Sequence, residues 1–235
     1  MLNLLNKTVV IHQPDFLSYL GFFDRLLKCD LYVILDHVQY VRGTSRSWMN
    51  RDKIKTANGE KWLTLGVEKA PVGTPINQIM LKKSVEWRDN NLNLLRENYR
   101  KACFFAEIFP YVEKMYDFKC ERMMDFSLNA LEILLSLLDI KVEMVLSSTL
   151  DPQYKSNEML VDILQKVQAT IYLSGVGARD YYDPEPFAAT NIEVIWQDFK
   201  HPVYPQLYGE FIPYLSTIDM LFNCGTEQSR NIIRS

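Results

Sequence analysis

The stretch Val9–Tyr40 constrains the fold most, because it places two apolar runs on either side of one short apolar helix pattern. Its sequence is VVIHQPDFLSYLGFFDRLLKCDLYVILDHVQY. The first run, KTVVIH when it is read from Lys7, is rich in β-branched residues, and the run DLYVILD is equally apolar. Such runs are typical of parallel strands buried on both faces. A strand, a helix and a strand within about 30 residues predict a βαβ unit with a right-handed crossover.

The same alternation returns near the end of the chain. VEMVLSS, TIYLSG and IEVIWQ have the pattern of strands, and residues 158–167 have the pattern of a helix. Residues 84–138 carry helical spacing, whereas KWLTLGV and INQIMLKK indicate exposed or edge strands. The run YLSTIDMLFN predicts a closing helix that Gly225 stops.

These patterns predict the α/β class, with a mostly parallel Rossmann-like sheet, flanking helices and a central helical insertion or cap. The chain length fits a single domain over residues 1–235, in which residues 84–138 form a helical sub-region.

Composition excludes several classes of protein. A formal net charge of -3, from 26 basic and 29 acidic residues, is unlike that of a dedicated nucleic-acid-binding protein. The four cysteines form no C-x-x-C pair, which argues against a cysteine-built zinc site and a disulfide scaffold. No apolar run approaches the roughly 20 residues of a membrane span, and the N-terminus lacks the features of a signal peptide. We therefore expect a cytoplasmic protein with reduced cysteines.

Motifs for common cofactors are missing from the sequence. It contains neither the glycine motif of dinucleotide-binding proteins nor that of the P-loop. No cluster of His, Asp and Glu has the spacing of metal ligands. We therefore predict no metal site and no particular cofactor.

Polar side chains stand where several predicted strands end. In an open parallel sheet, ligands bind beyond the carboxyl ends of the strands, so these residues can share one crevice. A structural role, such as capping a turn, explains any single one of them equally well. Polar residues at the ends of four predicted strands together favour a binding site. The residues are His12 and Gln13, then Asp36, His37 and Gln39, then Ser174 and Gly175, and finally Gln197.

His12 is the candidate acid or base, because imidazole titrates near neutral pH. The helix that begins near Tyr19 directs its free backbone N–H groups toward the same loop, which suits a phosphate or a carboxylate.

A basic stretch around Trp48 follows the second strand. Arginines beside an aromatic ring suit phosphate binding and base stacking. Asn50 and Arg51 are the sharper candidates, because apolar neighbours anchor the pair to the core. A solvated loop is the simpler explanation for the remaining residues, Arg42, Arg46 and Lys55.

Two later loops carry further candidates. In LSGVGARDYYDPEPF, Gly175 and Gly177 permit close approach of the backbone to a ligand, and Asp180 offers a carboxylate to a polyol such as a sugar. A turn followed by packed tyrosines explains this stretch equally well. The proline-stiffened loop QDFKHPVYPQL adds His201, Tyr204 and Gln206.

An ordered series of blocks resembles the WbqC-like family over essentially the whole chain. The blocks are HQPDFLSYLGFFDRL, CDLYVILDHVQY, NRDKIK and NGEKWLTLGV, followed by YLSGVGARDYY, VYPQ and LSTIDMLFNCG. This family is associated with bacterial surface-polysaccharide clusters, including those for O-antigen synthesis. The resemblance implies a cytoplasmic enzyme that acts on nucleotide-activated or lipid-linked sugars, with an amino sugar as the expected substrate. Its pattern falls on His12, Gln13, Pro14, Tyr19, Gly21, Asp36, Gln39, Asn50, Arg51, Gly59, Ser174, Gly175, Tyr204, Gln206 and Asp219.

Three hypotheses follow. The first is a transferase that attaches an acyl or aminoacyl group to the amine of a nucleotide-linked sugar, with His12 as base, Asp36 orienting the amine and Arg51 holding the diphosphate. The second is a non-catalytic protein that holds a sugar or a partner in the same crevice. The third is an aminoacyl-tRNA-dependent transferase whose basic stretch contacts RNA. A weaker likeness of the first βαβ unit to pantothenate-synthetase-like nucleotidyltransferases adds ATP as a possible source of the activated group.

Overall fold

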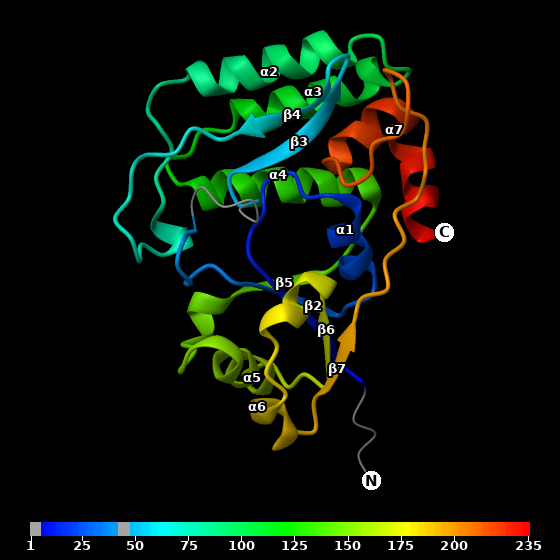
Figure 1. Cartoon of the computed structure of the whole chain (residues 1–235). Helices are drawn as coiled ribbons and strands as arrows, with labels where there is room; N and C mark the ends of the chain where they lie inside the picture. Colours follow the sequence, from blue (N-terminus) through cyan, green and yellow to red (C-terminus); the bar gives the residue numbers. More distant parts are fainter. Residues whose placement is uncertain (1–5, 42–47) are drawn as a thin grey trace. The chain divides into compact units, whose positions relative to one another are not determined.

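A five-stranded parallel sheet forms the centre of one of the two compact units into which the chain divides. The computed structural model describes residues 6–41 and 48–235. Each pair of neighbouring strands in this sheet is parallel, in the order β5-β2-β1-β6-β7 (Figure 1). The strands are β1 (Thr8–His12), β2 (Leu31–Ile34), β5 (Glu143–Leu146), β6 (Ile171–Ser174) and β7 (Glu193–Trp196).

Counted in chain order within this sheet, the strands stand 3-2-1-4-5. A doubly wound Rossmann sheet has this order, followed by a sixth strand. The predicted α/β class with a mostly parallel sheet is therefore confirmed. The three middle residues of β1 and all four residues of β2 are buried, as strands covered on both faces must be.

Helices connect and cover these strands. The unit comprises residues 1–13, 24–37 and 141–200, and it contains α5 (Ser156–Lys166), α6 (Glu185–Ala188) and two short 3-10 helices, η2 (Ser147–Leu150) and η3 (Val176–Tyr181). Helix α1 (Leu20–Leu27) begins in one unit and ends in the other. Both sides of α1 are buried, including the polar side that bears Asp24 and Arg25, at 8% and 4% exposure.

The second unit comprises residues 14–23, 38–140 and 201–235. Helix α4 (Met123–Leu138) supplies much of its core, with Phe126, Leu134 and Leu138 at most 1% exposed. Residues 84–138 are largely helical. The unit contains an antiparallel hairpin of β3 (Arg51–Thr56) and β4 (Gly59–Thr64), together with η1 (Ile76–Gln78), α2 (Glu86–Tyr99), α3 (Phe105–Asp117), α4 (Met123–Leu138) and α7 (Thr217–Arg234).

Two local predictions were wrong. INQIMLKK forms η1 and two isolated bridges, whereas the charged run Arg51–Thr56 forms a strand. Gly225 does not end the last helix. It interrupts α7 with φ 72° and ψ 177°, after which the helix continues. The phenyl ring of Phe104 lies against this glycine, at the place where a Cβ atom would be.

The first prediction concerns the interruption at Gly225. In Gly225→Ala, the new Cβ would lie 2.4 Å from Cδ1 of Phe104, on a backbone with φ +72°. Backbone strain and overpacking together should lower the free energy of unfolding by about 2–4 kcal/mol. Gly73→Ala is the control, since Gly73 has φ +92° with nothing within 4 Å. The control should lose only about 1 kcal/mol in urea denaturation. Equal losses in the two variants would contradict the role of Phe104.

Candidate functional site

The carboxyl ends of the five parallel strands meet at one edge of the sheet. His12 ends β1 and pairs in register with Ile34, the last residue of β2. Strand β6 ends at Ser174, which pairs with Trp196 of β7. Several predicted residues therefore stand at or just beyond this edge, among them His12, Asp36, Ser174 and Gly175.

Strand order reverses between β1 and β6, because the chain continues to β2 on one side of β1 and later to β7 beyond β6. The register Thr8↔Ile171 and Val9↔Tyr172 places His12 level with Gly175 when it is extended along the strands. In doubly wound sheets the crevice that binds ligands opens at this reversal. The pair His12 and Gly175 thus stands where such a fold binds its ligand.

Arg25 lies at the same place. A Cβ atom at Gly175 would be 3.0 Å from Nη1 of Arg25, so the missing side chain makes room for the guanidinium. Arg25 is only 4% exposed, and its positive charge acts on His12. Its neighbour Asp24 accepts a hydrogen bond of 2.7 Å from Nε2 of Gln197, the residue that follows β7.

His12 is half-buried and neutral at physiological pH. Burial, and then the charge of Arg25, lower the pKa of its imidazole from 6.5 to about 3. The Nδ1 atom lies 2.9 Å from the carbonyl oxygen of Gln13, an acceptor, so Nδ1 carries the proton in the neutral ring. The lone pair of His12 therefore resides on Nε2, the nitrogen that can accept a proton.

Asp36 ties the end of β2 to the segment after β5. Its buried carboxylate accepts hydrogen bonds from Oγ of Ser147 at 2.9 Å, from N of Ser148 at 2.8 Å and from Oγ of Ser148 at 2.6 Å. The Nδ1 atom of His37 lies 2.6 Å from the same Ser147 hydroxyl. This geometry gives Asp36 a structural task, in addition to any contact with a ligand.

Two further predicted residues of the first unit follow strand ends, Gln13 directly and Asp180 at a distance of six residues. Gln13 accepts hydrogen bonds at its carbonyl oxygen from His12 and from the hydroxyl of Tyr32. Asp180 is exposed in η3, the short helix that follows Gly175.

Six predicted residues belong to the second unit. The ring of Tyr19 lies over Gly21, where a Cβ atom would be 2.4 Å from it, and Tyr214 packs edge-on against this ring at 6.1 Å. Gln39 is exposed, and Asn50 is 9% exposed at the start of the β3–β4 hairpin. Arg51 of β3 lies over the indole of Trp62.

Tyr204 and Gln206, the last two, converge on a buried carboxylate. Asp219 of α7, fully buried, accepts hydrogen bonds from the hydroxyls of Tyr99 at 2.6 Å and Tyr204 at 2.9 Å, and from Nε2 of Gln206 at 2.9 Å. Burial raises the pKa of Asp219, and these donors oppose the rise. Lys55, also buried, donates to Oε1 of Gln206 at 3.1 Å and to the carbonyl of Glu210.

Several of these groups were missed in the sequence. Arg25 was not predicted, because it shares the polar side of LGFFDRLL with Asp24, and such a side is usually exposed. In the fold that side is buried. Ser147 and Ser148 directly follow β5. A polar residue at a strand end is the signal that selected His12 and Ser174, and it could have selected these serines too. Lys55 was read as solvated, but residues more than 150 positions away bury it. Arg42 and Arg46 lie outside the residues that the structure describes.

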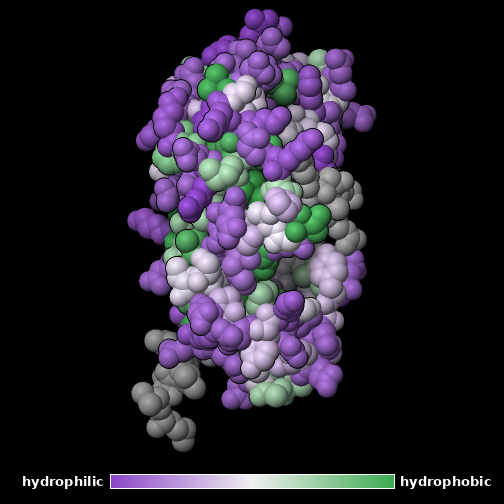
Figure 2. All heavy atoms as spheres, turned by 90° about the vertical axis from the view of Figure 1, so that its left-hand side faces the viewer, coloured by the Kyte–Doolittle hydropathy of each residue, from purple (hydrophilic) through white to green (hydrophobic). Residues whose placement is uncertain are grey.

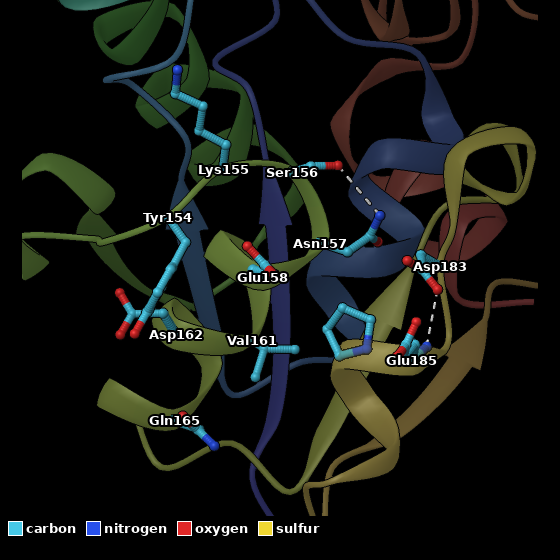
Figure 3. Close-up of a pocket in the computed structure, with 11 residues that line it drawn as sticks. Tyr154, Lys155, Ser156, Asn157, Glu158, Val161, Asp162, Gln165, Asp183 and Glu185 are labelled. Carbon is cyan, nitrogen blue, oxygen red and sulfur yellow. Dashed lines mark hydrogen bonds between the residues drawn. The ribbon is translucent and has the colours of Figure 1, made fainter.

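A surface hollow lies elsewhere in the first unit (Figure 3). It has a volume of about 610 Å³, between the first two turns of α5 and the start of α6. Among its described lining residues are Lys155, Glu158, Asp162, Asp183 and Glu185, and none of the predicted site residues. Mixed charges and wide opening to solvent give it no distinct chemistry.

Neither a metal-binding cluster nor a membrane-spanning helix is found among the described residues. Residues 6–41 and 48–235 contain no group of three or more His, Cys, Asp or Glu arranged to hold a metal ion. Within the same ranges, no helix is long and apolar enough to cross a membrane. Figure 2 shows one face of the molecule, where hydrophilic side chains predominate and hydrophobic ones form small groups.

The second prediction concerns the three histidines, His12, His37 and His201. Burial lowers the pKa of each imidazole, and Arg25 lowers that of His12 further. In an NMR titration, none should titrate above 6.5, and His12 should titrate last on acidification, near pH 3. Single His→Gln variants assign the resonances. A normal pKa for His12 would contradict its placement beside Arg25.

The third prediction concerns the buried carboxylate. In Asp219→Asn, the amide NH₂ faces groups that are themselves donors, so the free energy of unfolding should fall by about 2 kcal/mol or more. A raised carboxyl pKa means that the folded wild type binds the proton more tightly than the unfolded chain. Wild-type stability should therefore decline as pH rises above about 4, and its margin over the variant should narrow. Urea denaturation of both proteins from pH 4 to 8 measures that margin. A margin that widens with pH would contradict the raised pKa.

Comparison with known proteins covers nearly the whole chain. An uncharacterized protein of Mycobacterium tuberculosis, Rv1507c, is 33% identical over 226 residues, which are 94% of this chain and 95% of that protein. No solved structure matches the chain significantly. The model of the WbqC-like protein family matches residues 13–231. The chain therefore belongs to the WbqC-like protein family.

Proposed function

We propose that this protein is a transferase of bacterial surface-polysaccharide biosynthesis, which attaches an acyl or aminoacyl group to the amine of a nucleotide-linked amino sugar. The observation that carries the proposal is the set of groups at the strand-order reversal. There His12, Arg25 and Gly175 combine a neutral imidazole, a buried guanidinium and a backbone without a side chain. Acyl transfer to an amine needs a base that removes a proton from the nitrogen, and a positive charge that stabilises the developing oxyanion.

The proposed step forms a bond between the sugar nitrogen and the carbonyl carbon of an activated acyl donor. The nitrogen loses one proton, and the carbonyl carbon loses its leaving group. In the proposal, Nε2 of His12 takes the proton. Arg25 stabilises the negative charge that develops on the carbonyl oxygen, and Gly175 lets the reacting atoms approach the backbone. Asp36 acts through position, because it holds the ends of β2 and β5 together.

The low pKa of His12 bears on this role. An imidazole with a pKa of about 3 is a weak base, and burial and the charge of Arg25 lower it. An anionic group that binds beside Arg25 would offset the guanidinium charge and raise the pKa toward the range of a general base. In the proposal, an anionic substrate beside Arg25 restores part of the basicity of His12, namely the part that the charge of Arg25 removes.

The fourth prediction tests the transfer. Purified protein is incubated with nucleotide-linked amino sugars or their hydroxyl counterparts, and with an acyl thioester or aminoacyl-tRNA as donor. Mass spectrometry should detect acylation of the amino sugars alone. His12→Gln should lower kcat by about 10²–10⁴-fold. His37→Gln is the matched control, since His37 follows the neighbouring strand and contacts Ser147 instead.

Three outcomes would decide the matter against the proposal. Full activity of His12→Gln would contradict the role of His12 as base. Equal acylation of amino and hydroxyl sugars would contradict the amine as acceptor. Binding of the sugars without any product would indicate a binding protein.

A further inference from the structure

One face of the β3–β4 hairpin gathers two cations and two indoles. Lys53 pairs with Trp62 across the hairpin and Arg51 pairs with Thr64, so these side chains share a face. The guanidinium carbon of Arg51 lies 4.3 Å from the centre of the Trp62 ring, and Nζ of Lys53 lies 5.3 Å from it. The ring of Trp48 lies 5.4 Å from that of Trp62, tilted by 44°. We name Trp48, Arg51, Lys53 and Trp62 the indole–cation patch.

The other face of the hairpin is buried in the core. Asp52, Ile54 and Leu63 are at most 2% exposed and alternate with the patch residues. Lys55 follows Lys53 on the patch face, but it is buried at 1% exposure beneath the segment 206–210. The side chain of Lys53 stays 27% exposed, so the patch face is covered at one end and reaches solvent at the other.

We propose that the indole–cation patch binds a nucleoside diphosphate, with the base on the indoles and the phosphates on Arg51 and Lys53. The inference goes beyond the proposed function and does not rest on it, because the indole–cation patch lies wholly within the second unit. Binding itself needs no transfer step.

The contact of Arg51 with the indole is compatible with a phosphate contact. A cation–π contact uses the face of a guanidinium, whereas its N–H groups point outward in its own plane. These N–H groups are the ones that donate paired hydrogen bonds to phosphate oxygens. The indole holds the guanidinium in place by cation–π attraction, so less side-chain freedom is lost when the phosphate binds.

The two indoles suit a base. Every nucleobase offers a flat face, and stacking on one aromatic side chain contributes about 1–3 kcal/mol. Trp48 and Trp62 are tilted rather than parallel, and both are partly exposed, which leaves aromatic surface for a further ring.

Glu60 favours a small nucleotide over a long nucleic acid. Its carboxylate lies 2.5 Å from Nζ of Lys53 and is 38% exposed at the border of the patch. Two phosphates reach the two cations, whereas an extended strand would carry further phosphates past this carboxylate. The net charge of -3 adds no general attraction for a polyanion.

The fifth prediction uses the tryptophans as reporters. Uridine, cytidine, adenosine and guanosine diphosphates are titrated into the full-length protein, and tryptophan fluorescence is recorded. At least one should quench the emission saturably. Arg51→Gln should weaken its Kd by roughly tenfold or more, since it removes a charge-assisted pair. Lys53→Gln should weaken binding by a smaller factor.

Arg96→Gln is the matched control. Arg96 also lies over an aromatic ring, that of Phe109 at 4.9 Å, and also pairs with a glutamate, Glu113. The substitution removes the same charge and should leave the Kd unchanged. Trp62→Phe should abolish most of the quenching if the base lies on the patch. The melting temperature of each variant shows whether it is folded.

Four results would overturn the inference. They are no saturable quenching with any of the four diphosphates, equal loss of affinity in Arg51→Gln and Arg96→Gln, full quenching in Trp62→Phe, and quenching by single-stranded RNA alone. A failed transfer assay with intact nucleotide binding would overturn the proposed function and leave this inference standing. Transfer without nucleotide binding to the patch would do the reverse.

Discussion

The pairing of β1 with strands on both sides is the constraint on which the first unit depends. Parallel strands cannot be joined by a tight turn, so each must return through a crossover, and all of them end at the same edge. Because the chain fills one side of β1 first and the other side later, the order reverses at His12 and Gly175. The pairing of backbone strands therefore determines where the residues of the candidate site lie.

The second unit is organised by buried charge. Asp219 and Lys55 are both removed from water, and Tyr99, Tyr204 and Gln206 complete their hydrogen bonds. A buried ion is tolerated only when its partners are complete, so this network specifies how the hairpin, α2 and α7 fit together. Tyr204 and Gln206, chosen from the sequence as ligand contacts, thereby have a sufficient structural reason to be present.

The sequence predicted those parts whose local pattern and tertiary role agree. The β1–α1–β2 unit was recognisable because its apolar runs are both locally periodic and buried. Strand β3 was missed because its letters, RDKIKT, are mostly charged. Its burial comes from distant contacts, such as those of Lys55 with residues 206–210, and no local pattern contains these.

Some residues of the candidate site could be predicted from local sequence, and others could not. His12 and Ser174 end strands and Asp36 follows one, and a general rule for parallel sheets places strand ends together. The role of Arg25 depends on which way α1 faces, and the indole–cation patch depends on the register of a hairpin whose first strand was not predicted. Residues that act through their neighbours are the ones that a linear pattern conceals.

Strand order also affects how the protein is made. The central strand β1 leaves the ribosome well before β6, its partner at the order reversal, since 163 positions separate the two in the register Thr8↔Ile171. At about 5–20 residues per second, translation needs roughly ten seconds or more to supply it. During that time one edge of β1 has no native partner to pair with. A nascent chain of this design needs either a temporary cover for that edge or a folding order in which the sheet closes last.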